Sequence, residues 1–155
     1  MKILYLSHPT PFNFDLIAGL KKLGVEIFYF NDESGWFINS LRSRFSFVRQ
    51  LNKKLLNKRL IKTCRQWQPD VFFTTKGITI NPETLAQIKS LGIKTVNWNL
   101  ENIYHKDYYQ WFLKTAAAYN LFIKMDSSRA DSIKTGYLAV AIKPERYQTP
   151  DLTED

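Results

Sequence analysis

The chain has 155 residues, of which 45% are hydrophobic and 15% aromatic, and its formal net charge is +8. This composition is too apolar for a disordered chain, and the length suits one domain with its own core. The single cysteine, Cys64, excludes an internal disulfide and a cysteine-based metal cage.

The first half of the chain predicts two strands and two helical regions. Residues 2–7 and 25–30 are rich in aliphatic and aromatic residues, as strands are. Between them we expect a loop over 7–14 and a helix over 16–23, capped by Asp15 and ended by Gly24. After a turn over 31–35, residues 36–67 predict one long helix or two broken ones. Its apolar positions at helical spacing are Leu41, Phe45, Val48, Leu51, Leu55 and Cys64.

Residues 68–102 give the clearest β-α-β pattern in the chain. The apolar run Val71–Thr75 predicts a strand that ends in Lys76-Gly77. Pro82 then opens a helix over 82–91, with Asn81 as a possible cap, and residues 94–99 predict the next strand. Because parallel sheets bind ligands at the carboxyl ends of their strands, polar residues that follow these strands are candidate site residues.

The last third predicts a helix over 105–118, a strand over 120–125, a helix over 127–135 ended by Gly136, and a strand over 137–142. Strands and helices thus alternate throughout, which favours an α/β fold: a Rossmann-like three-layer α/β/α sandwich with a mostly parallel sheet of about six strands. We expect one domain over residues 1–142 and a linker or tail over 143–155, where prolines and polar residues dominate.

The positive charge belongs to one segment. No acidic residue lies between Glu33 and Asp70, and the remaining 13 basic and 14 acidic residues of the chain nearly cancel. An amphipathic basic helix in this segment could attract an anionic membrane, a lipid-linked phosphate, a protein partner or nucleic acid, or be a solvated face. The candidate residues for binding an anionic surface are Arg49, Lys53, Lys54, Lys58, Arg59 and Lys62.

Several familiar motifs are missing. The turn after the first strand lacks the glycine-rich dinucleotide fingerprint, and no phosphate-loop or GxSxG motif is present. The two histidines, His8 and His105, do not have the spacing of a metal site. We therefore expect no bound cofactor or metal. Nucleic acid is an unlikely partner, since no RNA-binding aromatic motif or helix-turn-helix pattern occurs.

Location follows from the same features. The apolar run at the N-terminus is too short for a signal peptide, and no stretch approaches the roughly 20 apolar residues of a spanning helix. We expect a cytoplasmic protein that lies at the membrane surface if the basic helix binds lipid.

The order of the pieces points to a family. The run KILYLS precedes LIAGLKKLGVEIFYF, QPDVFFTTKG precedes NPETLAQIKSLGIKTVNWNLEN, and the chain continues with YNLFIKMDSSRADSIKTGYLAVAIKPERY. In this order they resemble the N-terminal domain of two-domain, GT-B type glycosyltransferases, in particular the group similar to spore-maturation CgeB proteins. The resemblance covers almost the whole chain. One departure is that Asn102 and Ile103 follow Glu101, where the family tends to carry a second acid and a proline.

The resemblance implies the acceptor-binding half of a glycosyltransferase that transfers a hexosyl group from a nucleotide sugar. In that family a C-terminal domain holds most donor contacts, and no segment here corresponds to it. The chain alone is therefore expected to be weak or inactive, with a donor-binding domain or subunit as its partner. Self-association is also expected, because the cleft edge would expose apolar surface. The alternative is a non-catalytic Rossmann-like module that docks through its basic helix.

The resemblance also suggests roles for single residues. A histidine placed like His8 is the general base in several families of this fold, and Glu101 is a second candidate acid or base. Alternatively, His8 is a loop residue bonded to backbone. The substrate-binding candidates are Lys76 for an anionic group, Gly77 for close approach of a ligand, Asn99 and Asn102 for sugar hydroxyls, and Asp126 at a helix start. A solvated lysine, a turn glycine and helix caps are the structural alternatives.

Overall fold

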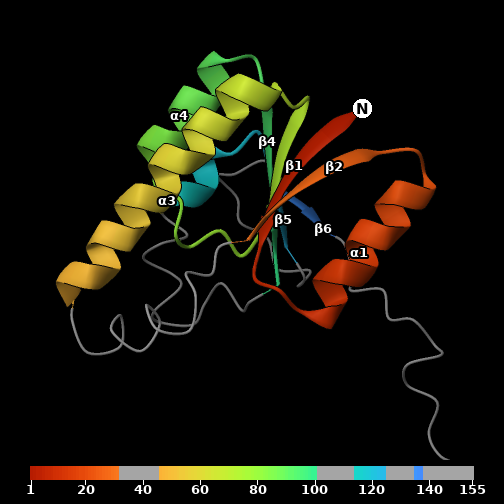
Figure 1. The fold of residues 1–155 in the computed structure, drawn as a ribbon, viewed down its shortest axis with the longest axis horizontal. Helices are drawn as coiled ribbons and strands as arrows, with labels where there is room; N and C mark the ends of the chain where they lie inside the picture. Colours follow the sequence, from red (N-terminus) through yellow and green to blue (C-terminus); the bar gives the residue numbers. More distant parts are fainter. Residues whose placement is uncertain (32–45, 101–113, 125–134, 138–155) are drawn as a thin grey trace, which may run out of the picture.

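The computed structural model describes residues 1–31, 46–100, 114–124 and 135–137. Within these ranges six strands form one parallel sheet in the order β2-β1-β3-β4-β5-β6 (Figure 1). This confirms the Rossmann-like α/β fold. The strands are β1 (Lys2–Ser7), β2 (Glu26–Asn31), β3 (Val71–Thr75), β4 (Lys94–Asn99), β5 (Leu121–Lys124) and β6 (Thr135–Tyr137).

Helices lie on both faces of the sheet. Helix α1 (Pro11–Lys22) covers one face, and α3 (Ser46–Trp67) and α4 (Pro82–Ser90) cover the other (Figure 1). The chain passes from β1 to its neighbour β2 and then returns to β3 on the other side of β1. The connections after β1 and β3 therefore diverge, which makes the β1/β3 boundary the topological switch point, where ligands bind in open α/β sheets.

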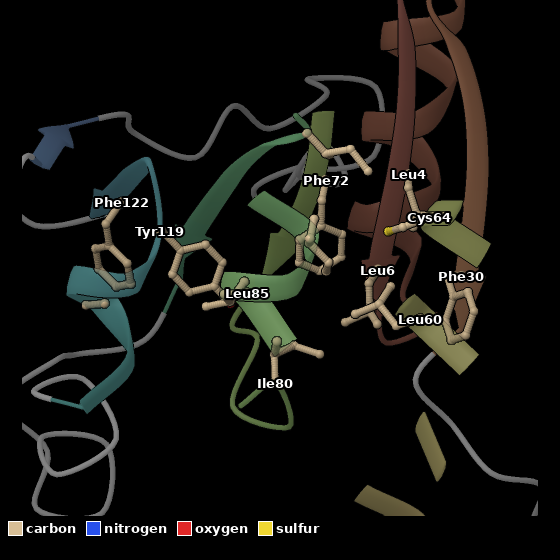
Figure 2. Close-up of a cluster of buried hydrophobic side chains, with 13 residues drawn as sticks. Leu4, Leu6, Phe30, Leu60, Cys64, Phe72, Ile80, Leu85, Tyr119 and Phe122 are labelled. Atoms are coloured by element: carbon tan, nitrogen blue, oxygen red, sulfur yellow. The ribbon is translucent and has the colours of Figure 1, made fainter. Parts of the chain in front are cut away.

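Most of the core lies between the sheet and the α3/α4 layer. Strand β1 is buried on both faces, which explains its unbroken apolar run. Figure 2 shows Phe30 and Leu60 at one end of the cluster and Tyr119 and Phe122 at the other. A smaller cluster of Ile3, Tyr5 and Ile17 lies under α1. The bounds of the strands predicted from the sequence match those of β1–β4 to within about one residue.

Helix α1 begins earlier than the sequence indicated. The expected loop over 7–14 and the Asp15 cap are wrong, because the helix starts at Pro11 with Thr10 as its N-cap. The Thr10 hydroxyl accepts a hydrogen bond from the backbone N–H of Asn13 at 3.3 Å. A proline at the first helical position loses no helical hydrogen bond, so Pro11 starts the helix rather than preventing it. At the other end Gly24, with φ of 76°, follows the helix as predicted.

Helix α3 confirms a helix over the described part of the basic segment, but of the predicted apolar stripe Cys64 is buried and the described leucines before it are not. Leu51 and Leu55 are exposed, whereas Asn57, Leu60 and Cys64 are buried. Two other members of the predicted stripe, Leu41 and Phe45, lie outside the described residues. The reason is tertiary: the C-terminal half of α3 packs on the sheet, and the contacts there fix the rotation of the whole helix.

The end of the chain needs a further correction. Thr135 and Gly136 were expected to end a helix, but both belong to β6, which pairs with β5. Residues 116–118 form a short 3₁₀ turn, η1 (Ala116–Ala118), before β5. The helices expected over residues 105–113 and 127–134, the strand continuation over 138–142 and the tail over 143–155 lie outside the described residues.

Candidate functional site

Two loops meet at the switch point. The segment 8–10 leaves the carboxyl end of β1 toward α1, and the segment 76–81 leaves β3 toward α4. Because β1 and β3 are hydrogen-bonded neighbours, the residues that follow them lie at the same edge of the sheet. His8 and Lys76 are both exposed at this edge, in the loops where the sequence placed them.

A buried polar cluster fixes the backbone beneath His8. The side-chain nitrogen of Asn13, in α1, donates a hydrogen bond to the His8 backbone carbonyl at 2.7 Å. The carbonyl oxygen of the same Asn13 side chain accepts from the Tyr5 hydroxyl at 2.5 Å and from the Thr75 hydroxyl at 3.4 Å. Asn13 thus ties β1, β3 and α1 together. Burial raises the pKa of Tyr5, so its hydroxyl stays protonated and available as the donor to Asn13.

The turn after β3 is strained. Lys76 has φ of 64°, which is uncommon for a residue with a side chain, and Gly77 follows with φ of 68°. The Gly77 amide donates to the Thr75 carbonyl at 2.8 Å, which closes a γ-turn around Lys76. The Lys76 carbonyl accepts from the Asn97 side chain at 3.0 Å. Strained residues held by their surroundings cluster at functional sites, which supports Lys76 as a candidate.

The surroundings of Gly77 explain this glycine without a ligand. A Cβ atom here would lie 2.7 Å from the Asn97 side-chain nitrogen, 2.7 Å from the Tyr119 hydroxyl and 3.0 Å from the Thr74 methyl. The space that the missing side chain leaves is therefore filled by residues of the protein itself. The predicted role of Gly77 in close approach of a ligand stays a prediction.

Polar atoms without partners lie on both faces of the sheet near this edge. Within the described residues, the Ser7 hydroxyl and the Trp98 indole nitrogen make no hydrogen bond of normal length, although both side chains are buried. The same holds for the Asn97 carbonyl oxygen and the Tyr119 hydroxyl. Each buried, unpaired polar group costs about 1–3 kcal/mol. Ser7 ends β1, Asn97 and Trp98 lie near the end of β4, and Tyr119 lies just before β5.

An open hollow of about 700 Å³ lies at the same edge on the α3/α4 side. The start of α4, from Asn81 to Glu83, forms one wall, and Lys53 of α3 and Lys114 provide positive charge. The Asn81 side chain makes no cap hydrogen bond, although Asn81 occupies the predicted N-cap position. The hollow thus combines two lysines with a helix start, an arrangement that favours anionic groups, and Glu83 opposes them.

The remaining predicted residues divide into two groups. Asn99 ends β4 at this edge and is buried, with interactions of its own. Glu101, Asn102 and Asp126 lie outside the described residues, so their roles stay predictions. Among the described residues no group of acidic, histidine and cysteine side chains could hold a metal ion.

Sequence reasoning missed Asn13, Tyr5, Thr75 and Asn97. Each lies inside an element, where a polar residue is easily taken for an exposed one. The available signal was the pair Thr74-Thr75 and the amides Asn97 and Asn99, which put polar residues at the ends of strands otherwise rich in apolar residues.

A second hollow of about 480 Å³ lies at the opposite edge, lined by Cys64, Asp70 and Ile93 among others. Burial raises the pKa of the Cys64 thiol to about 12, so it stays protonated and is a poor nucleophile. This edge holds the amino ends of the strands, and we do not assign a site there.

Comparisons with known proteins support the fold. No family model and no curated protein matches this chain. Its structure is similar to that of MurG from Acinetobacter baumannii, a glycosyltransferase of the GT-B type, with a TM-score of 0.62 and 10% sequence identity. The fold is GT-B-like. The match covers 96% of this chain and 49% of MurG, so the chain spans about half the length of that structure.

A second solved structure is a dTDP-4-dehydrorhamnose reductase, an RfbD ortholog from Clostridium acetobutylicum. It matches with a TM-score of 0.49 and 14% identity over 80% of this chain and 52% of its own. A likeness at this level carries no argument. The narrower resemblance to CgeB-like proteins stays a prediction from the sequence.

Proposed function

We propose that this chain is the acceptor-binding half of a two-domain glycosyltransferase. The observation that carries the proposal is the placement of His8 and Lys76 in the two loops that diverge at the switch point of a GT-B-like fold. The hollow beside the start of α4 lies at the same edge and offers room for a polar, anionic acceptor. A second domain, matching the other half of such enzymes, would hold the nucleotide sugar.

The chemistry assigns each group a separate task. The imidazole of His8 takes the proton of an acceptor hydroxyl as that oxygen attacks the anomeric carbon of the donor. The bond from this carbon to the diphosphate oxygen breaks, and the nucleoside diphosphate leaves with the electron pair. A neutral imidazole suits this step because its usual pKa lies near neutral pH. Lys76 binds an anionic group of the acceptor, and Glu101 is the alternative base.

The test is nucleotide release by the native protein that carries this chain. The protein is incubated with UDP-, GDP- and dTDP-sugars in turn, with a mixture of candidate acceptors, and released nucleoside diphosphate is quantified by chromatography. The proposal expects release with at least one donor class, and a large loss on His8→Ala. Lys22→Ala at the end of α1, on an exposed lysine away from the site, is the matched control.

The alternative is a binding module without catalysis. It uses the same fold, and its discriminating result is a protein that binds a partner yet releases no nucleotide with any donor. In that case His8→Ala would leave partner binding unchanged, and the strained turn at Lys76 would need another explanation.

A further inference from the structure

Helix α3 has two distinct faces. Its inner face packs on the sheet through Leu60 and Cys64, which are fully buried, with Leu56 and Trp67 packed beside them. The inner contacts are concentrated in the second half of the helix. In Figure 1 the first turns of α3 extend past the end of α4 toward the side where β1 and β3 end. Among the described residues, those of α3 that are buried, Asn57, Leu60 and Cys64, all lie in its second half.

The outer face of these first turns is apolar. Phe47, Leu51 and Leu55 are spaced by four residues, so they line up along one side of the helix. Their side chains are 73%, 44% and 48% exposed. By helical rotation of about 100° per residue, this apolar ridge lies opposite Leu60 and Cys64. Two residues of the predicted apolar stripe, Leu51 and Leu55, thus fall on a surface in contact with solvent.

Positive charge continues the same line. One to three turns beyond the apolar ridge, Lys58, Lys62 and Arg65 occupy the outer face, and Lys54 flanks the ridge itself; all four are exposed. The 22 residues of α3 include no acid. The outer face is therefore apolar at its start and cationic further along, with no negative charge on the helix to compensate it.

This combination selects one kind of partner. A second copy of the chain would bring cations against cations. A nucleic acid would use the cations and leave the apolar ridge in water. An anionic bilayer uses both, because apolar side chains enter the acyl boundary while lysines pair with headgroups. No helix among the described residues is long and apolar enough to cross a membrane, so α3 would lie on the surface.

We propose that the outer face of α3 docks on an anionic lipid bilayer, with Phe47, Leu51 and Leu55 inserted at the interface and Lys54, Lys58 and Lys62 on the headgroups. This docking does not depend on catalysis. It adds one feature to the proposed function. Because α3 also contributes Lys53 to the hollow at the carboxyl edge, docking holds that edge close to the bilayer.

The experiment measures cosedimentation of the purified native protein with vesicles of phosphatidylcholine alone and of phosphatidylcholine mixed with phosphatidylserine. The expected result is binding to the mixed vesicles only. Leu51→Gln with Leu55→Gln removes the ridge and should lower the partition coefficient more than tenfold, from about tenfold per buried leucine. The matched control, Leu23→Gln with Leu91→Gln, removes two exposed leucines elsewhere and should leave it unchanged.

A second pair of variants tests the charge. Lys58→Gln with Lys62→Gln should lower the partition coefficient by more than tenfold, from about fivefold per cation. Lys21→Gln with Lys22→Gln removes the same charge from α1 and should have little effect. A Phe47→Trp variant adds a direct reading, because insertion shifts its fluorescence to shorter wavelength and lets brominated lipid quench it.

Three results would overturn the proposal. One is the absence of binding to the mixed vesicles. Another is binding that the charge variant weakens and the ridge variant does not, which would mean adsorption without insertion. The third is a ridge variant that converts a dimer into a monomer while vesicle binding is unaffected, which would assign the ridge to a second copy. Thermal unfolding of every variant checks that the fold is intact, and nucleotide release is not part of this readout.

Discussion

Asn57 in α3 holds the backbone of Asn81 at the start of α4. Its carbonyl oxygen accepts from the Asn81 amide at 3.2 Å, and its amide nitrogen donates to the Thr79 carbonyl at 2.9 Å. A buried asparagine of α3 therefore fastens the loop between β3 and α4, which is the neighbouring helix on the same face of the sheet. This contact joins the two surfaces to which we assign binding, the hollow at the carboxyl edge and the outer face of α3.

Replacing Asn57 should destabilise the protein. Asn57→Ala leaves the Asn81 amide and the Thr79 carbonyl without their partner, which we expect to lower the free energy of unfolding by about 2–4 kcal/mol. Urea unfolding followed by circular dichroism measures this. Lys58→Ala, at the next and exposed position, is the control, and we expect a change of no more than about 0.5 kcal/mol. Equal effects of the two changes would contradict the role of Asn57.

Gly77 and Gly92 form a matched pair. Both have positive φ, 68° and 81°, but a Cβ at Gly92 would meet nothing within 4 Å, whereas one at Gly77 would lie 2.7 Å from Asn97 and Tyr119. Gly92→Ala should cost about 1 kcal/mol for its backbone alone. Gly77→Ala should cost about 1–3 kcal/mol more, because packed side chains must move. Thermal unfolding of both variants gives the difference, and similar losses would show that the space at Gly77 is not tightly filled.

The strain at Lys76 predicts a trade between stability and function. Lys76→Gly relieves φ of 64° and should raise the free energy of unfolding by about 1 kcal/mol, while nucleotide release falls. Gln68 has φ of 49° at the opposite edge of the sheet, so Gln68→Gly should bring a similar gain without loss of activity. A Lys76→Gly protein with full activity would remove this lysine from the proposed site.

Alkaline pH should destabilise the fold through Cys64. Burial raises the pKa of this thiol from 9.0 to about 12, so above pH 9 the unfolded chain loses a proton that the folded chain keeps. The stability from this group is present below pH 9 and declines up to about pH 12, by about 1.4 kcal/mol per pH unit. Tyr5 and Tyr119 have raised pKa values for the same reason and add to the decline above pH 10.

The measurement is urea unfolding between pH 8 and pH 10. Cys64→Ala should be less stable at pH 8 because it leaves a small cavity, and from pH 9.0 to 10.0 its stability should fall less steeply than that of the wild type because it lacks the thiol. A wild type and variant with the same slope would show that Cys64 is accessible to ionisation in the folded protein.

The sequence predicted the central β-α-β unit well because its boundaries carry local signals. Pro82 and Gly92 mark the two ends of α4, and the apolar runs Val71–Thr75 and Lys94–Asn99 are the strands β3 and β4. The predicted start of the first helix is wrong because a proline such as Pro11 is found both in loops and at the first position of a helix. The neighbouring sequence allows both positions for this proline, so it does not fix where the helix begins.

The faces of α3 and the composition of the site could not be predicted in this way. Leu51 and Leu55 have the spacing of a buried stripe, and only the packing of Leu60 and Cys64 against the sheet turns that stripe outward. Asn13 and Thr75 are far apart in sequence, and their contact depends on the order of the strands. The positions of His8 and Lys76 at this edge could be predicted because the carboxyl ends of parallel strands define an edge before any side chain is placed, whereas the role of His8 as a base rests on the family resemblance.

The most direct test of the proposed function is the rate of acceptor-dependent nucleotide release by the native protein with His8 and with alanine at that position. If His8 is the base, His8→Ala should lower the turnover number by about 10²–10⁴ while donor binding is unchanged. A His8→Ala protein that turns over as fast as the wild type would contradict the account, and so would a wild-type protein that releases no nucleotide with any donor.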